Sequence, residues 1–68
     1  MFQAGDEVLI TSCEDDLRAV GRTGWVIDEV PPGPLTEGRW TVHGAGLFIG
    51  PLLCHTHELR KTGKNRRR

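Results

Sequence analysis

Long hydrophobic runs and cysteines are scarce in this sequence. No apolar stretch approaches the roughly 20 residues that cross a bilayer, and the N-terminal residues lack the positive patch and apolar run of a secretory signal. The two cysteines, Cys13 and Cys54, are enough for one disulfide, whereas a secreted protein of this size more often carries about four to eight. We therefore expect a reduced, cytoplasmic chain that makes no contact with a membrane.

Helix signals are also nearly absent. Nine glycines and four prolines are spread over 68 residues, so that few stretches as long as a stable helix lack a breaker. The one candidate, residues 14–20, is too short to form a helix by itself. It is predicted to be a loop that contains a single helical turn.

Segments rich in β-branched and aromatic residues recur instead, separated by turn residues. Strands are predicted at residues 7–11, 24–30, 38–43, 47–54 with a bend at 50–51, and around 60–61. The second strand has to end at Pro31-Pro32, because proline cannot donate to a ladder. Five short strands at this spacing predict an all-β barrel or compact sandwich, and closing the sheet would remove exposed edges.

The charges are distributed unevenly along the chain. Residues 1–59 carry three arginines and all nine carboxylates, whereas residues 60–68 carry six lysines and arginines and no acidic residue. Such a basic end is suited to binding phosphate, and it is equally typical of a solvated terminus. We expect one domain over residues 1–61, followed by a disordered basic tail over residues 62–68.

Four short segments carry a resemblance to a known family: Gly5–Ile10, Gly21–Val26, Trp40–Val42 and Glu58–Arg60. Together they resemble the SH3-like barrels of the KOW type, over roughly residues 4–61. This resemblance implies a five-stranded barrel that contacts RNA or protein partners rather than catalysing a reaction. The insert at residues 31–37 departs from a minimal KOW unit, in the region of the usual binding loops.

The chain is also similar to the trimethoprim-insensitive type II dihydrofolate reductases, which are small SH3-like barrels with one active pore in a tetramer. Their chemistry depends on the motif Val-Gln-Ile-Tyr before a proline. The matching stretch here is Leu47–Gly50 before Pro51, with Phe48 at the glutamine position and Gly50 at the tyrosine position. Reductase activity is therefore not expected, although assembly through this strand remains open.

Cys54 and His57 are the candidate metal ligands, because thiolate and imidazole bind zinc, and Cys13 is available to complete a site. No second pair of closely spaced ligands accompanies them, and strand alternation places Cys54 and His55 on opposite faces. We therefore expect no metal and no cofactor, with Cys54 buried as a small apolar side chain. No catalytic residue is predicted either, since any short chain with three histidines offers nucleophilic triads by chance.

The two tryptophans admit two interpretations. Trp25 and Trp40 are either core residues or surface platforms on which a base or a peptide stacks. In the second strand, Trp25 and Ile27 would share one face while Val26 and Val30 share the other, so both faces are apolar. Either a bulge near residue 28 reconciles the two faces, or a partner covers one of them; we favour a partner and hence a homo-oligomer.

These observations favour a non-enzymatic binding module that contacts nucleic acid or a nucleoprotein. The candidate contact residues are Trp25, Trp40, Phe48, Arg60, Lys61, Lys64 and Arg66. The first alternative is a protein-interaction or homo-oligomer assembly domain that binds no nucleic acid. The second is an enzyme whose site lies in the pore of an oligomer.

Overall fold

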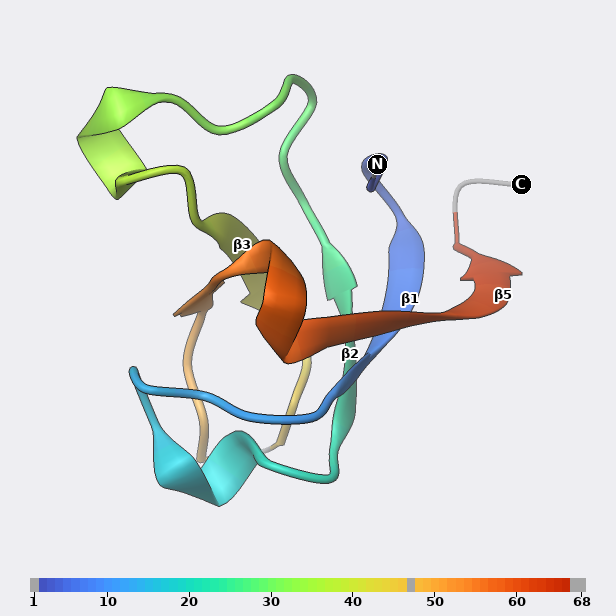
Figure 1. Ribbon diagram of the computed structural model, residues 1–68. Helices are drawn as coiled ribbons and strands as arrows, with labels where there is room; N and C mark the ends of the chain where they lie inside the picture. Colours follow the sequence, from blue (N-terminus) through green and yellow to red (C-terminus); the bar gives the residue numbers. More distant parts are fainter. Residues whose placement is uncertain (1, 47, 67–68) are drawn as a thin grey trace.

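The protein is all-β. The computed structural model describes residues 2–46 and 48–66, and it places five antiparallel strands in one sheet with the order β4-β3-β2-β1-β5 (Figure 1). The strands are β1 (Asp6–Ile10), β2 (Thr23–Val26), β3 (Trp40–His43), β4 (Leu52–Cys54) and β5 (Leu59–Asn65). Three short 3-10 turns are η1 (Leu17–Ala19), η2 (Pro34–Thr36) and η3 (Thr56–Glu58). The all-β fold and the single helical turn within residues 14–20 are thus confirmed.

Two strands, β2 and β4, are much shorter than the sequence predicts. β2 ends at Val26 rather than at residue 30, and the predicted strand over residues 47–54 is reduced to β4 at its C-terminal end. Before β4, Gly46 and Ile49 form an isolated bridge around a turn that contains Phe48; residue 47 lies outside the described residues. In a turn this tight the chain reverses before it can pair as a strand.

β5 extends to Asn65, past the end that the sequence predicts near residue 61. Its pairing with β1 shifts register between Val8↔Lys61 and Asp6↔Asn65. Gly63 lies inside this bulge with a φ of 97°, a backbone conformation that glycine adopts without steric cost. Residues 62–65, expected in a tail, are therefore part of the sheet. The expected disorder of residues 67–68 lies outside the described residues.

One face of the sheet holds the core, which alternate residues of the strands fill. The buried apolar side chains are Val8, Ile10, Cys13, Ala19, Val26, Trp40, Val42, Ala45, Leu52, Cys54 and Leu59. Trp40 and Val42 are both buried, which confirms the prediction that they share a face. The Trp40 indole donates a hydrogen bond from Nε1 to Thr56 Oγ1 at 3.0 Å, so its polar atom is satisfied inside the core.

The prediction of two apolar faces on β2 assumes a strand that continues to residue 30, but β2 ends at Val26. Val26 points into the core, and Ile27 N still donates to Thr41 O at 3.1 Å. The next bond of the ladder is made by a side chain, because Asp28 Oδ2 accepts a 2.6 Å hydrogen bond from Thr41 N. The chain then leaves the sheet, and Val30 is exposed on the following loop. The expectation that Val26 and Val30 share one strand face was wrong for this reason.

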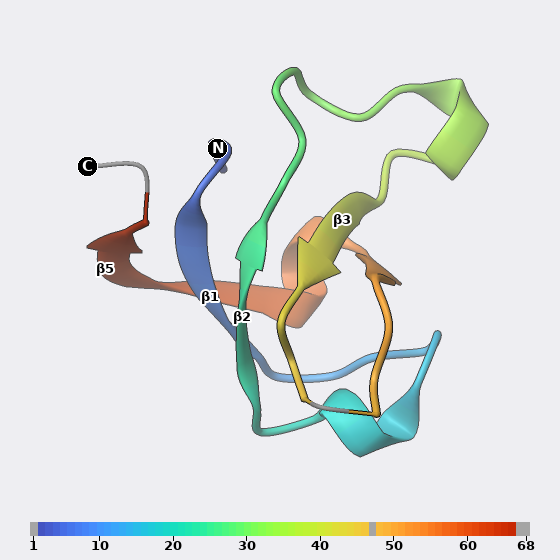
Figure 2. The same cartoon turned by 180° about the vertical axis from the view of Figure 1, so that it is seen from behind.

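The connecting segments gather at two ends of the molecule (Figures 1 and 2). The long loop with η2 projects at one end, and η1 lies at the other end beside the segment that joins β3 to β4. The N-terminal segment runs next to the end of β5, where Arg66 N donates to Gly5 O at 2.8 Å. Within the described ranges, no helix has both the length and the hydropathy needed to cross a membrane.

Candidate functional site

Trp25 occupies the middle of the outer face of the sheet, the side away from the core. The strand register aligns Glu7 with Trp25 and Trp25 with His43, and residues that pair directly across strands share a face. The Trp25 and His43 rings lie 5.5 Å apart between centroids at an angle of 55°. Trp25 is half-buried whereas Trp40 is buried. Of the two predicted tryptophans, only Trp25 is therefore available to a ligand.

Arg66 lies directly over Trp25. Its Cζ atom is 3.7 Å from the centroid of the Trp25 ring, which is contact distance for a cation–π pair. The backbone fixes this position, because Arg66 N donates to Gly5 O at 2.8 Å. The preceding Asn65 donates from Nδ2 to Ala4 O at 3.2 Å. Arg66 is thus held by the end of β5 rather than by a free tail.

A small hollow of about 190 Å³ opens beside this pair. Its lining includes Ala4, Gly5, Trp25, Ile27, Glu29 and Arg66. Gly44 on the adjoining turn lets the Trp25 ring lie close to the backbone, since a Cβ atom at Gly44 would fall 2.0 Å from ring atom Cζ3. His43, Gly44 and the lining backbone of Ala4 and Gly5 were not predicted, because nothing in the sequence shows which turn and which terminus meet Trp25.

The predicted basic residues divide between two regions. Arg60 pairs with Leu9, whose side chain alternates with the buried Val8 and Ile10, so Arg60 shares the outer face with Trp25. Lys61 and Lys64 line a separate hollow of about 410 Å³. The predicted set is therefore brought together only in part.

Asp6 neutralises one of these cations. Its Oδ2 lies 3.6 Å from Lys61 Nζ, and its Oδ1 accepts from Asn65 Nδ2 at 2.9 Å. Partial burial acts to raise the pKa of Asp6, but the hydrogen bonds from Asn65 and Gln3 and the charge of Lys61 together lower it. Asp6 consequently stays ionised beside Lys61, and Lys61 adds little net positive charge to the surface.

Phe48 lies on the turn before β4. It lines a third hollow, of about 400 Å³, with Arg18, Arg22, Gly46 and Ile49. Its side chain is 89% exposed. Phe48 and Trp25 therefore line different hollows.

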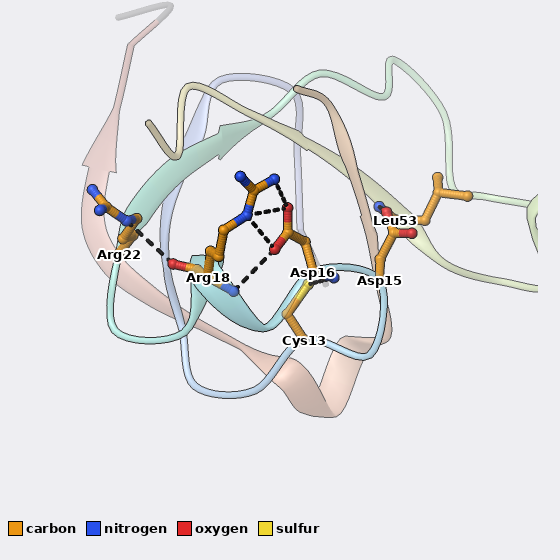
Figure 3. A network of polar contacts seen from close by, with 6 residues as sticks. All are labelled: Cys13, Asp15, Asp16, Arg18, Arg22 and Leu53. Atoms are coloured by element: carbon orange, nitrogen blue, oxygen red, sulfur yellow. Dashed lines mark hydrogen bonds and ion pairs between the residues drawn. The ribbon is translucent and has the colours of Figure 1, made fainter. Parts of the chain in front are cut away.

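The carboxylates of Asp15 and Asp16, in the acidic segment before η1, accept hydrogen bonds from within the molecule (Figure 3). Asp16 caps η1 by accepting from Arg18 N at 3.0 Å, and it also accepts from the Arg18 guanidinium at 2.7 Å. The hydrogen bonds from Arg18 lower the pKa of Asp16. Asp15 Oδ2 accepts from Leu53 N at 3.1 Å, which ties this loop to β4. These carboxylates serve the fold, and they lie apart from the Trp25 face.

The sulfur atoms of Cys13 and Cys54 lie 3.9 Å apart in the core as free thiols. The burial of Cys54 agrees with the prediction of a small apolar side chain. Burial, followed by the proximity of Cys13, raises the pKa of the Cys54 thiol to about 12. His57 is exposed and stacks on His55 at 5.3 Å between ring centroids. No group of three or more histidine, cysteine or acidic side chains within residues 2–46 and 48–66 is placed to hold a metal ion.

Glu58 is the buried polar residue that sequence reasoning missed. It is only 1% exposed, and its carboxylate accepts from His55 N at 2.7 Å and from Glu14 N at 3.0 Å. The first bond closes η3, and the second fastens η3 to the loop that follows β1. Glu58 stands three residues after His55, which is the spacing of the glutamate in a capping box. The first residue of that motif is serine or threonine, so the histidine here hides the signal.

Comparison of the chain with family models, with curated proteins and with solved structures finds no match. Any functional argument therefore depends on the geometry of the described residues themselves. The outer face around Trp25 is the region where that geometry combines aromatic surface, positive charge and a hollow.

Proposed function

We propose that this chain is a non-enzymatic binding module for nucleic acid or a nucleoprotein partner, built as an SH3-like barrel of the KOW type. The observation that carries the proposal is Arg66, which lies 3.7 Å from the Trp25 ring centroid on a face that also bears His43 and Arg60. Aromatic rings and guanidinium planes stack on bases, and the same cations attract phosphate. The antiparallel order of five strands is consistent with such a barrel.

The residues before β5 carry more carboxylates than cations, which would repel phosphate. Several of these carboxylates are paired or buried, which weakens the repulsion. Asp16 is paired with Arg18, and Asp6 is paired with Lys61. Glu58 is buried and accepts two backbone hydrogen bonds. Paired carboxylates repel a phosphate chain less than free ones do, because the neighbouring cation cancels much of their field.

Neutralising three cations of the C-terminal segment tests the proposal. In the variant R60Q/K64Q/R66Q, affinity for a single-stranded oligonucleotide is expected to fall at least tenfold at low salt. The slope of log affinity against log salt concentration should flatten by about 2, because each lost phosphate contact removes about 0.7 on a single strand. Fluorescence anisotropy titrations at several salt concentrations measure both quantities.

The matched control is R18Q/R22Q/R39Q, which changes the net charge equally at arginines outside β5. Equal losses in the two variants would refute a local site, because they would show attraction by net charge alone. Truncation before residue 60 is not a suitable test, since residues 60–65 pair with β1 and their removal would unfold the sheet.

A second candidate function is assembly with another copy, and the exposure of Phe48 favours it. Phe48 is 89% exposed and lines a hollow together with Ile49, Arg18 and Arg22, and exposed apolar surface of this kind marks contact surfaces. If this surface mediates assembly, the protein sediments as an oligomer and Phe48→Ser converts it to a monomer. Leu35→Ser is the control, because Leu35 is 102% exposed on η2 at the opposite end. A wild-type chain that sediments as a monomer at every concentration contradicts this function.

A further inference from the structure

The hollow beside Trp25 differs in size and lining from the other hollows of the surface. At about 190 Å³ it is smaller than the roughly 300–1,000 Å³ of sites that hold whole small molecules. Its walls combine the apolar surfaces of Ala4, Trp25 and Ile27 with one cation, Arg66, and one carboxylate, Glu29. This is room for a single flat ring with polar groups on its edge.

Arg66 gives this hollow a rigid planar wall. Its guanidinium lies against the Trp25 ring at 3.7 Å, and its backbone is tied to Gly5 O. Because the backbone of Arg66 is held and its guanidinium already rests on the ring, a ligand that packs here has less of the arginine left to immobilise. A second planar group can then stack on the open face of the guanidinium, beside the Trp25 ring that the guanidinium covers.

Two larger hollows, that of Lys61 and Lys64 and that of Phe48, also contain cations. The hollow of Lys61 and Lys64 is lined by Gln3, Asp6, Gly63 and Asn65 and has no aromatic wall. In the hollow of Phe48, the guanidinium of Arg18 is engaged by Asp16 at 2.7 Å, and Arg22 donates from Nε to Arg18 O at 3.2 Å instead of lying over an aromatic ring. Among the hollows described here, that of Trp25 therefore fits a stacked ring best.

We infer that the hollow formed by Trp25, Arg66, Ile27 and the backbone of Ala4 and Gly5 seats one unpaired base of a single-stranded nucleic acid. This inference rests on the proposed function and names its ligand class. A base in a duplex is paired and stacked on both faces, and it offers only its groove edges to a protein. Only a base turned out of the stack presents the flat face that Trp25 and Arg66 accept. Arg60, on the same face, is placed to contact the phosphates of the flanking backbone.

Charge-conserving substitutions separate stacking from simple attraction. Arg66→Lys keeps the positive charge but removes the plane, and Arg60→Lys makes the same exchange away from the ring. With a single-stranded oligonucleotide as the probe, Arg66→Lys and Trp25→Leu are each expected to weaken binding by about fivefold or more. Arg60→Lys should change it by less than about twofold, since a lysine still contacts phosphate as a point charge. Circular dichroism verifies that each variant is folded.

Two further probes define the ligand. A duplex of the same sequence and a strand of the same length without bases are both expected to bind at least tenfold more weakly than the intact single strand. Duplex or abasic strand binding as tightly as the intact strand overturns the base site while leaving the proposed function in place, and so does an Arg66→Lys effect no larger than that of Arg60→Lys. Absence of binding to all three probes overturns the proposed function together with this inference.

Discussion

Glu58→Ala is expected to remove most of the stability of the domain. The substitution deletes a carboxylate that is 1% exposed and leaves His55 N and Glu14 N without their acceptor. A hydrogen bond to a charged group contributes about 1.5–3 kcal/mol, and a buried donor without a partner costs a similar amount. The expected loss in the free energy of unfolding is about 3–5 kcal/mol, whereas a domain of this size has only about 3–10 kcal/mol.

Urea denaturation followed by tryptophan fluorescence measures this loss. Glu58→Gln keeps one oxygen acceptor and is expected to fall between the wild type and Glu58→Ala. Glu37→Ala is the control, since Glu37 is exposed and lies 3.6 Å from Arg39 in a surface ion pair; such pairs contribute at most about 1 kcal/mol. If Glu58→Ala and Glu37→Ala unfold at the same urea concentration, Glu58 does not hold η3 to the loop after β1.

Gly24→Ala is the second substitution with a large expected effect. A Cβ atom at Gly24 would lie 2.6 Å from His43 O and 2.8 Å from Val42 Cγ1. Both atoms belong to β3, so relief requires β2 and β3 to move apart. Overpacking of this kind costs about 1–3 kcal/mol, and we expect the upper part of that range because one of the two atoms is backbone. The melting temperature should fall by about 10 °C or more.

Gly33→Ala is the matched control for this substitution. Gly33 has a φ of −113°, and no described atom lies within 4 Å of a Cβ added there. The change is expected to leave the melting temperature unchanged or to raise it slightly, because alanine restricts the unfolded chain. Equal melting temperatures for the two variants would show that β2 and β3 are not packed as closely as the structure places them.

The sequence predicts the strands of this fold better than their ends. Alternation of apolar residues identifies the buried face of β3, because the residues that set it are local. The end of β2 depends instead on Asp28, whose side chain replaces a backbone acceptor for Thr41. The length of β5 depends on a bulge opposite Asp6 and Val8, which lie more than fifty residues earlier in the chain. Such partners cannot be read from a local pattern.

The sequence predicts which kinds of residue form the candidate site, but not which of the predicted residues lie together. Trp25 and Arg66 are recognisable as an aromatic and a cation that suit nucleic acid. That they touch depends on the hydrogen bond from Arg66 N to Gly5 O, which joins the two ends of the described chain. Lys61 is also among the predicted contact residues, yet its ammonium group is paired with Asp6. Trp40 is a predicted contact residue too, but it fills the core, because the first residue of β3 faces inward.

The pairing of β1 with β5 also bears on when the surface around Trp25 can form. Ile10 pairs with Leu59, and Asp6 pairs with Asn65, so the sheet joins segments from nearly opposite ends of the described chain. Contacts so distant in sequence form slowly, because a long loop has to close before they form. A nascent chain therefore keeps one edge of β1 open until residue 65 has been synthesised. Since Arg66 follows β5, a chain whose β5 has not yet paired with β1 does not hold Arg66 against Trp25. Partly synthesised chains therefore lack the complete surface, and ligand binding at this face is confined to folded molecules.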